Sequence, residues 1–387
     1  MAAVSAGAEP EKHRLKWYDT GYELLEAKLA AISSARKIIR METYIYKDDD
    51  TGRRFRSALI EAGRRGVKVR LLVDAVGGMG LGADYFAELT ALPTCRMKWF
   101  NRPSLKTWSF RDHRKLLIID SRLTFVGGCN IAAVYHGDGV THGWRDGGLL
   151  AEGEVTKAVA AEFRVQWNRA DLARWNNSTR ERPGGREACE KCADVRALFI
   201  HPGFGQNPLR NAFREDLKKA REICITTAYF LPSTGLRKQL GSAVARGARV
   251  RLLLGGRSDV WLMQMATRAL YGPLLDAKME VWEYQPQVLH SKILVVDDVV
   301  YVGSSNLDPR SLRINFEVML RVQSPALAAE LRMVFEKDLS HSKRVTHEDA
   351  WKRPWWALLK QRFAKWLLGW LDPRVSEGML RRLYARP

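Results

Sequence analysis

The chain has 387 residues, of which 46% are hydrophobic, and its 63 Lys and Arg outnumber its 43 Asp and Glu to give a formal net charge of +20. This apolar content excludes a disordered chain, and the length suffices for two compact units. No stretch reaches the roughly 18 to 20 apolar residues of a membrane span, and the first residues lack the apolar core of a signal peptide. The positive charge predicts a polyanionic partner, either nucleic acid or an anionic membrane surface.

The five cysteines are an odd number, which without a signal peptide suits a reducing cytoplasm. Cys189 and Cys192 form a single CxxC pair. A zinc site would need a second pair or histidines at ligand spacing, and neither follows. We therefore interpret this pair as part of a polar linker and expect no metal.

Two parts of the chain repeat the same predicted order of strand, helix and strand. The expected elements are 37–46, 55–65 and 67–73 in the first part, and 222–231, 235–246 and 250–254 in the second. The phrases RRGVKVRLLVDAVGG and ARGARVRLLLGGRSD nearly superimpose. This order predicts parallel pairing of the two strands through a right-handed crossover.

A second repeat follows in each part. Residues 113–130 read HRKLLIIDSRLTFVGGCN, and residues 290–306 read HSKILVVDDVVYVGSSN. Each copy has Lys two residues and Asp seven residues after the His, then Gly-Gly or Gly-Ser, then Asn. Each copy also predicts a hairpin within a buried sheet. A single H-x-K-x4-D pattern is weak evidence, but its duplication predicts two halves of one reactive site.

The polar, Gly-rich stretch TRERPGGREACEKC at 179–192 marks the boundary between the two parts. We expect a first lobe at 1–178, a linker at 179–193, a second lobe at 194–345 and a terminal segment at 346–387.

The terminal segment contains WKRPWWALLKQRFAKWLLGWL, with five Trp and no acidic residue. One helical face would carry Trp355, Leu359, Phe363, Trp366, Leu367 and Trp370. Gln361 and Lys365 lie off that face, and Lys360 lies at its edge. An aromatic face opposite a basic one is typical of a helix in a membrane interface. The alternative is a helix that packs onto the core of its own protein.

The repeated cluster fits phosphoryl transfer. His113 and Lys115 share one strand face, as do His290 and Lys292. A lysine beside a histidine can hold a phosphate oxygen while the imidazole attacks phosphorus or gives a proton to the leaving oxygen. A reaction with retention needs both roles, so one His from each part would supply the pair.

The residues around the histidines suggest supporting roles. Gly127–Gly128 and Gly303–Ser304 allow close backbone approach, and Asn130 and Asn306 would add amide donors to a phosphate clamp that needs no metal. Asp146 and Glu317 would each bind the distal ring nitrogen of a histidine and orient it. We expect the motif aspartates, Asp120 and Asp297, to fix turns rather than touch substrate.

The duplicated motif resembles the phospholipase D superfamily, and the wider phrases, such as METYIYKDDDTGRRF, TAYFLPSTGL and VGSSNLDPRSLRINFEVML, resemble bacterial cardiolipin synthases. The resemblance runs from about residue 15 to about residue 370. It implies an α/β fold of two pseudo-symmetric lobes, each a mixed sheet flanked by helices, with the active site at the lobe interface. It also implies the short, peripheral type, which lacks N-terminal transmembrane helices.

The resemblance further implies a site made of the two full motifs, which are His113, Lys115, Asp120, His290, Lys292 and Asp297. In that family the amino-terminal histidine attacks a phosphatidyl group, which corresponds to His113. The other, here His290, protonates the departing alcohol and deprotonates the incoming one.

The implied reaction joins two phosphatidylglycerol molecules into cardiolipin and releases glycerol, without metal or organic cofactor. The alternatives are a hydrolase of the same fold that forms phosphatidic acid, and a nuclease. We expect phospholipid substrates, an anionic membrane surface and no nucleic acid as partners. The expected location is the cytoplasmic side of a bacterial inner membrane, bound peripherally. The sequence predicts no oligomeric state.

Overall fold

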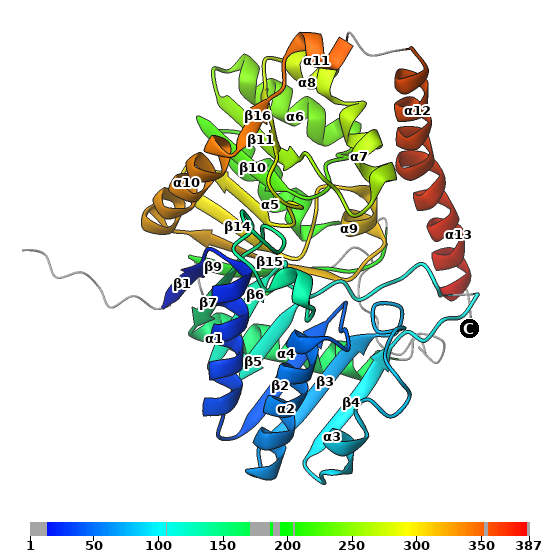
Figure 1. Cartoon of the computed structure of the whole chain (residues 1–387). Coiled ribbons are helices and arrows are strands. Elements are labelled where there is room, and N and C mark those ends of the chain that lie inside the picture. The colour runs from blue at the N-terminus through cyan, green and yellow to red at the C-terminus, as the bar shows by residue number, and fades with distance from the viewer. Residues whose placement is uncertain are drawn as a thin grey trace, which may run out of the picture.

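The computed structural model describes residues 14–105, 107–170, 186–188, 194–203, 206–351 and 355–384, and Cys189 and Cys192 lie outside these ranges. The described chain forms two sheets (Figure 1). The first contains β1 (Leu15–Tyr18), β2 (Ile38–Thr43), β3 (Lys68–Asp74), β4 (Cys95–Phe100), β5 (Leu116–Ile119), β6 (Leu123–Gly127) and β7 (Gly148–Glu152). The second contains β8 (Arg186–Ala188), β9 (Val195–Ile200), β10 (Glu222–Thr227), β11 (Arg249–Gly255), β12 (Glu280–Tyr284), β13 (Lys292–Val296), β14 (Val299–Gly303), β15 (Glu317–Gln323) and β16 (Ser342–Arg344).

The two sheets repeat one topology. The first has the order β1-β7-β6-β5-β2-β3-β4, and the second contains its counterpart, β9-β15-β14-β13-β10-β11-β12, with β8 and β16 added at the edges. As the crossover rule predicts, β2 pairs in parallel with β3, and β10 pairs in parallel with β11. The histidine motifs form the antiparallel hairpins β5–β6 and β13–β14. The predicted mixed α/β fold with two pseudo-symmetric halves is confirmed.

Three expected boundaries were wrong. The strands expected at 37–46 and 222–231 end at Thr43 and Thr227, because each threonine hydroxyl turns back to bond the carbonyl two residues on and the chain leaves the sheet. The helix expected at 55–65 starts earlier, at Asp50, because the Asp49 side chain accepts the Gly52 N–H and caps it.

Helices cover both sheets. Those before the linker are α1 (Gly21–Ser34), α2 (Asp50–Arg64), α3 (Ala87–Ala91), the 3-10 turn η1 (Ala133–Tyr135) and α4 (Glu154–Asn168). Those after it are α5 (Pro208–Leu217), α6 (Thr234–Ala245), α7 (Trp261–Arg268), α8 (Tyr271–Asp276), α9 (Pro309–Arg313), α10 (Pro325–Ser340), α11 (His347–Trp351), α12 (Trp355–Trp366), the π-helical turn η3 (Leu367–Leu371) and α13 (Asp372–Tyr384).

One apolar core joins the two lobes. It contains Val126 and Leu149 of the first sheet, Val302 and Val318 of the second, and residues of α4 and α10, which pack beside the facing sheets. Two further cores lie on the outer faces, under α1 and α2 in one lobe and under α5 and α6 in the other. Because the shared core is continuous, the histidine-bearing loops of the two lobes are held against each other.

The terminal helices lie along the second lobe and reach the first (Figure 1). α12 packs on α7, α13 packs near α9, and Ser376 of α13 lies 2.6 Å from Ser109 of the first lobe. α12 docks through Gln361 and Ala364, which are buried, whereas Leu359, Phe363 and Trp366 stay 53%, 59% and 47% exposed.

Leu359, Phe363 and Trp366 of the expected apolar face therefore stay exposed, and Leu367 is half-buried; the side chains of Trp355 and Trp370 lie outside the described part. In the portion of the chain that the structure covers, no helix is both long and apolar enough to cross a bilayer.

Candidate active site

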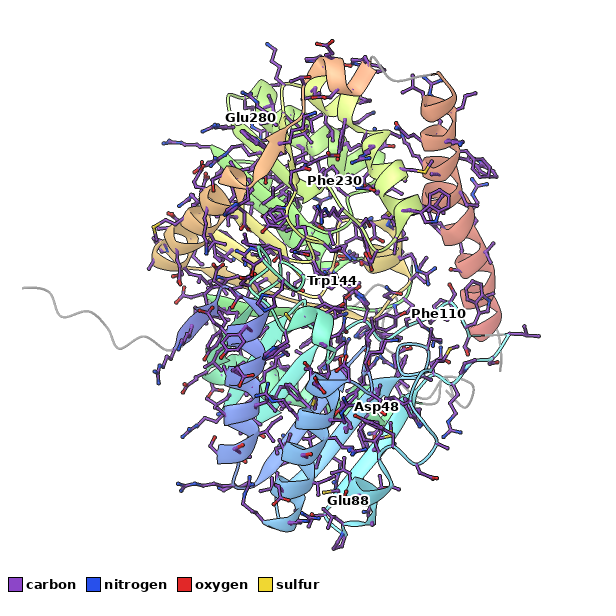
Figure 2. All side chains as sticks on the ribbon, viewed as in Figure 1. Asp48, Glu88, Phe110, Trp144, Phe230 and Glu280 are labelled. Carbon is purple, nitrogen blue, oxygen red and sulfur yellow. The ribbon has the colours of Figure 1, made fainter. Side chains whose placement is uncertain are left out.

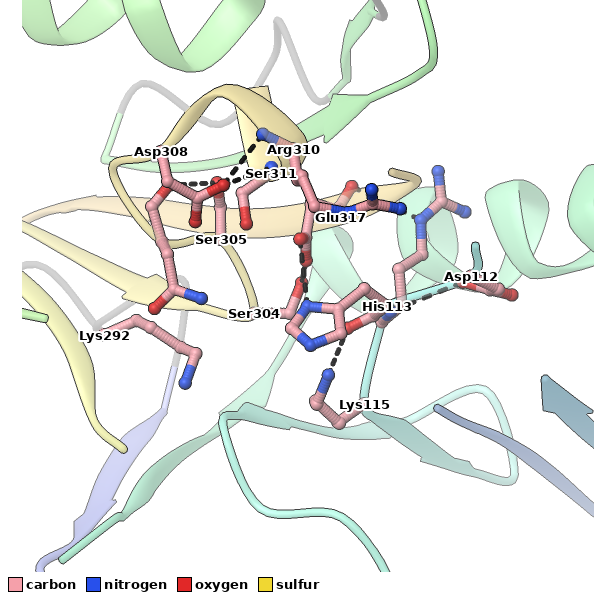
Figure 3. Close-up of polar contacts among 12 residues, drawn as sticks. Asp112, His113, Lys115, Lys292, Ser304, Ser305, Asp308, Arg310, Ser311 and Glu317 are labelled. Atoms are coloured by element: carbon pink, nitrogen blue, oxygen red, sulfur yellow. Dashed lines mark hydrogen bonds and ion pairs between the residues drawn. The ribbon is translucent and has the colours of Figure 1, made fainter. Parts of the chain in front are cut away.

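His113 lies just before β5, where two chain segments from different lobes meet. Its N–H donates to the carbonyl of Phe316 at 3.0 Å, beside an isolated bridge between Asp112 and Phe316. Its Nδ1 lies 2.9 Å from Oε1 of Glu317, which starts β15 and is fully buried (Figure 3). Ser304 donates its hydroxyl to the other carboxylate oxygen of Glu317 at 2.5 Å. This carboxylate therefore fixes the His113 ring through contacts from the second lobe.

His290 has the reciprocal environment. Its N–H donates to the carbonyl of Arg145 at 2.8 Å, and its Nδ1 lies 2.6 Å from Oδ2 of Asp146. The other oxygen of Asp146 accepts the Gly147 N–H at 2.8 Å. A Cβ added at Gly128, the counterpart of Ser304, would clash with the Asp146 carboxylate. Glycine is therefore required there, since this shorter carboxylate lies against the backbone.

The supporting carboxylates are exchanged between lobes. Sequence reasoning named Asp146 and Glu317 but did not assign each to a histidine. In the structure Glu317 of the second lobe holds His113, and Asp146 of the first lobe holds His290. Arg145 anchors the latter contact, because its buried guanidinium binds Asp338 of α10 at 2.8 Å and Asp19 at 2.6 Å. Each half of the site is therefore complete only when both lobes are folded together.

Both motif lysines are buried beside their histidines. The Lys115 ammonium donates to the His113 carbonyl at 2.5 Å, and that of Lys292 donates to the His290 carbonyl and lies 3.0 Å from Nδ1 of the His290 ring. Burial, with the charge of Lys292 as a further cause, lowers the pKa of Lys115 to about 7. Burial also lowers the pKa of Lys292. The charges of Glu317 and Asp146 oppose this lowering without outweighing burial, and two buried ammonium groups would favour a bound phosphate.

The histidines are neutral at pH 7. Burial first, and then the charges of Lys115 and Lys292, hold the pKa of His113 well below its usual range. Burial and Lys292 lower the pKa of His290 to about 4, although Asp146 acts in the opposite direction. Each lysine affects both histidines, so the four side chains form one electrostatic cluster. With Nδ1 of each ring turned to a carboxylate, Nε2 is left for substrate.

The motif aspartates lie at the far ends of their strands, in the hairpin turns. Asp120 accepts backbone N–H bonds from Lys37 and Ile38 at 2.7 and 2.8 Å. Asp297 accepts the corresponding bond from Glu222 at 2.9 Å. Both aspartates have positive φ, 53° and 47°. These contacts tie the start of β2 or β10 to the hairpin and do not reach the histidines.

The two motif asparagines are buried next to the ends of β2 and β10. Asn130 accepts the Ile45 N–H at 3.0 Å and donates to the hydroxyl of Tyr135 at 2.7 Å. Asn306 accepts from the hydroxyl of Thr227 at 3.4 Å. Each amide nitrogen keeps hydrogen-bonding capacity beyond these contacts, since an NH₂ group carries two donors.

Several neighbours of the histidines were missed from the sequence. Tyr44 contacts His113 edge-on with 5.0 Å between ring centroids, whereas Tyr135 and Trp144 lie 5.2 and 5.4 Å from His290. Arg310 of α9 lowers the pKa of His113 and donates to the Ser109 carbonyl at 3.0 Å. Its counterpart in the first repeat is Val134, so a search for repeated residues passes over it.

Among the described residues, no group of three or more His, Cys, Asp or Glu side chains is arranged to hold a metal ion.

Residues 29–138 and 213–339 match the protein family described as cardiolipin synthase, PLD-like domain. The matched segments include both histidines, both lysines and Glu317, and Asp146 lies shortly after the first segment. Among solved structures, phosphatidylserine synthase of Haemophilus influenzae superimposes with a TM-score of 0.67 over 94% of each chain, at 15% identity. At that identity the likeness concerns the fold alone.

Curated relatives extend over nearly the whole chain. The major cardiolipin synthase of Bacillus subtilis is 31% identical over 90% of this chain and 73% of that protein. Cardiolipin synthase B of Salmonella typhi is 30% identical over 93% of this chain and 91% of that protein, and its Escherichia coli namesake is 29% identical over 95% and 93%. With both sequence segments matched and the fold repeated, the chain belongs to the cardiolipin synthase family of enzymes with phospholipase D-like domains.

Proposed function

We propose that this enzyme transfers a phosphatidyl group from one phosphatidylglycerol to another, giving cardiolipin and glycerol. The observation that carries the proposal is the pair of imidazoles, buried for His290 and mostly buried for His113, each held at Nδ1 by a carboxylate of the other lobe and flanked by two buried ammonium groups. The lysines would hold the phosphate oxygens of the donor lipid. The family's relatives named cardiolipin synthase support the choice of substrate.

In the first step, Nε2 of His113 attacks the donor phosphorus, and the bond from phosphorus to the glycerol headgroup oxygen breaks. His290, which has taken up a proton from solvent because the donor lipid's phosphate offsets the lysine charges, gives that proton to the oxygen, and glycerol leaves. In the second step, His290 takes a proton from a headgroup hydroxyl of the acceptor lipid. The acceptor oxygen then bonds to phosphorus as the P–N bond to His113 breaks, which restores both histidines.

The surroundings of the two imidazoles favour this assignment. The His113 side chain is 13% exposed, against 5% for His290, so a lipid phosphate reaches it more readily. Its neighbour Arg310 adds a further cation beside the phosphorus that it would attack. The Asp146 carboxylate raises the pKa of His290, as a group that must accept a proton requires. A bound phosphate anion would act in the same direction by offsetting the lysine charges.

We also propose that the enzyme binds the cytoplasmic face of the bacterial inner membrane through the outward apolar face of α12. Leu359 and Phe363 belong to this face and are more than half exposed. Phe363 and Trp366 contact one another with 5.9 Å between ring centroids. Exposed aromatic side chains on a basic helix insert into the headgroup region of a bilayer.

The membrane proposal is tested by flotation with vesicles of phosphatidylcholine and phosphatidylglycerol. The variant Leu359→Ser/Phe363→Ser should float much less than the wild type. The control Tyr22→Ser/Met333→Ser removes side chains that are 52% and 67% exposed on α1 and α10, and should float normally. Equal flotation of both variants would contradict attachment through α12.

The reaction is tested by incubating the purified chain with phosphatidylglycerol vesicles and resolving the lipids by mass spectrometry. Cardiolipin and free glycerol in equal amounts are expected. Phosphatidic acid as the main product would instead identify a hydrolase, and unchanged lipid together with cleavage of added DNA would identify a nuclease.

A further inference from the structure

A second cationic feature lies outside the catalytic centre. A cavity of about 930 Å³ separates α12 and η3 from the second lobe, and its size falls within the range of about 300 to 1,000 Å³ typical of small-molecule sites. Five cationic side chains line it, namely Arg210, Arg237, Arg313, Arg362 and Lys365. None of the described residues that line it is acidic.

These cations are close enough to repel one another. Burial and the charges of Arg237 and Arg362 lower the pKa of Lys365. Burial and the charge of Arg210 lower the pKa of Arg313, against which Glu377 of α13 acts as a single opposing carboxylate. Gathering like charges in a partly buried space is unfavourable unless an anion occupies it.

The residues that line the cavity also carry hydrogen-bond donors. Nε of Arg237 is buried and has no hydrogen-bond partner in the described part of the chain, although its Nη2 binds the Thr234 hydroxyl at 3.2 Å. Ser233, Thr234 and Gly235, at the start of the 12-residue helix α6, also line the cavity. The unpaired N–H groups and positive dipole end of a helix start favour a phosphate.

The cavity and the catalytic centre share α9 as a wall. Pro309, Leu312 and Arg313 of this helix line the cavity. Arg310, between them, instead donates to the Ser109 carbonyl and lowers the pKa of His113. The cavity is therefore adjacent to the reacting groups but formed by different side chains.

We propose that this cavity binds the phosphate headgroup of an anionic phospholipid at a site separate from the catalytic histidines. The inference rests on the proposed attachment of α12 to a membrane. Trp366 lines the cavity and is 47% exposed on the same helix face as Phe363, so the cationic space opens beside the face that would enter the lipid. A lipid can thus place its phosphate among the arginines and its chains against α12, which a free phosphate does not exploit.

The test compares two double variants, both in a His113→Ala background that prevents turnover. Arg237→Gln/Lys365→Gln removes two cavity cations. Lys238→Gln/Lys360→Gln removes two exposed cations from the same helices outside the cavity, and so carries the same net charge. Binding is measured by co-sedimentation with phosphatidylcholine vesicles with and without phosphatidylglycerol, at physiological salt.

The cavity variant should bind phosphatidylglycerol vesicles about tenfold more weakly than the control variant, because it loses specific contacts as well as surface charge. Arg210→Gln, which removes a cavity cation from α5, should weaken binding in the same direction. Circular dichroism shows whether each variant is folded. Equal loss in the two double variants would overturn the proposal. Calorimetry measures the binding of inorganic phosphate to the same two double variants. If the cavity variant lost phosphate binding but bound vesicles as the control variant does, the assignment to lipid would be overturned.

Cardiolipin formation by the wild-type chain in detergent micelles separates this inference from the proposed function. Weaker vesicle binding by the cavity variant than by the control variant, without cardiolipin formation by the wild type, would support the cavity and contradict the proposed reaction. Cardiolipin formation together with equal vesicle binding by the two double variants would support the proposed reaction and contradict the cavity.

Discussion

The two halves of the active site share one arrangement of strands and motif residues but differ in the side chains around their histidines. In both, a histidine precedes a hairpin, a lysine lies beside it, and a carboxylate of the other lobe binds Nδ1. The neighbours of His113 are Ser304 on the carboxylate, Arg310 and the ring of Tyr44. Around His290 they are Gly128 and the rings of Tyr135 and Trp144.

The repeat brings the same groups to both histidines, whereas the residues outside the repeated pattern differ. The carboxylates differ most. Burial raises the pKa of Glu317 to about 7, whereas the contacts with His290 and Lys292 outweigh burial and lower the pKa of Asp146. A firmly ionised carboxylate supports a histidine that must accept protons. Glu317, near its pKa, supports a nucleophilic His113 only in its ionised form.

The largest expected effect is the loss of either histidine. His113→Ala and His290→Ala should each lower the rate of cardiolipin formation by at least about 10³-fold, because neither nucleophilic attack nor proton transfer has a substitute. The measurement is product formation from phosphatidylglycerol, with the thermal unfolding of each variant as a control. A variant that retains a tenth of the wild-type rate would contradict the division of roles.

A smaller effect should distinguish the residues beside the two carboxylates. In Gly128→Ser the new Cβ displaces Asp146 from His290, so the rate should fall about 10²-fold, as when an orienting carboxylate is lost. Ser304→Gly removes one hydrogen bond to Glu317, and the rate should fall about fivefold. Steady-state rates of both variants give the comparison. A larger loss of rate in Ser304→Gly than in Gly128→Ser would contradict this expectation.

The pH dependence of the rate of cardiolipin formation should show the titration of Glu317. As pH falls through about 7, this buried carboxyl gains a proton and stabilises charge on His113 less well, so the rate should decline on the acid side. Glu317→Gln should be slower and lack that decline, because an amide does not titrate. The rate should also decline on the alkaline side, where Lys115 loses its proton near pH 7. This second decline should remain in the variant. Profiles of the same shape would exclude Glu317 as the group responsible.

The smallest effect on catalysis is expected at the motif aspartates. Asp120→Ala should destabilise the fold by about 2 kcal/mol, through lost backbone hydrogen bonds and a left-handed φ that Ala adopts poorly. Asp120→Asn should cost less, since Asn tolerates that conformation. Denaturant unfolding and the turnover rate should be measured together. A loss of turnover as large as that of His113→Ala with unchanged stability would make Asp120 a direct participant.

Much of the molecule follows from repeated residues. The parallel pairs β2–β3 and β10–β11, the two hairpins and the identity of the six charged or imidazole groups at the centre are legible in the spacing of the sequence. Hydrophobic periodicity fixes these elements because each must bury one side against a core.

What could not be predicted depends on tertiary contacts. The exchange of Asp146 and Glu317 between lobes follows from how the loops meet at Phe316 and Arg145, which no local pattern encodes. Arg310 lies outside the repeat. For α12, periodicity identified the apolar face, but its direction depends on Gln361 and Ala364 fitting against the second lobe (Figure 2 shows the side chains along this helix).

The most direct test traps the covalent intermediate. The variant His290→Ala is mixed with a phosphatidic acid ester of p-nitrophenol, whose leaving group needs no proton. The protein is quenched with denaturant at mildly alkaline pH, where a P–N bond survives, and is digested and analysed by mass spectrometry. The account predicts a burst of nitrophenol and a phosphatidyl adduct on the peptide that contains His113. A burst and an adduct at His290 in the variant His113→Ala, with none in His290→Ala, would contradict it.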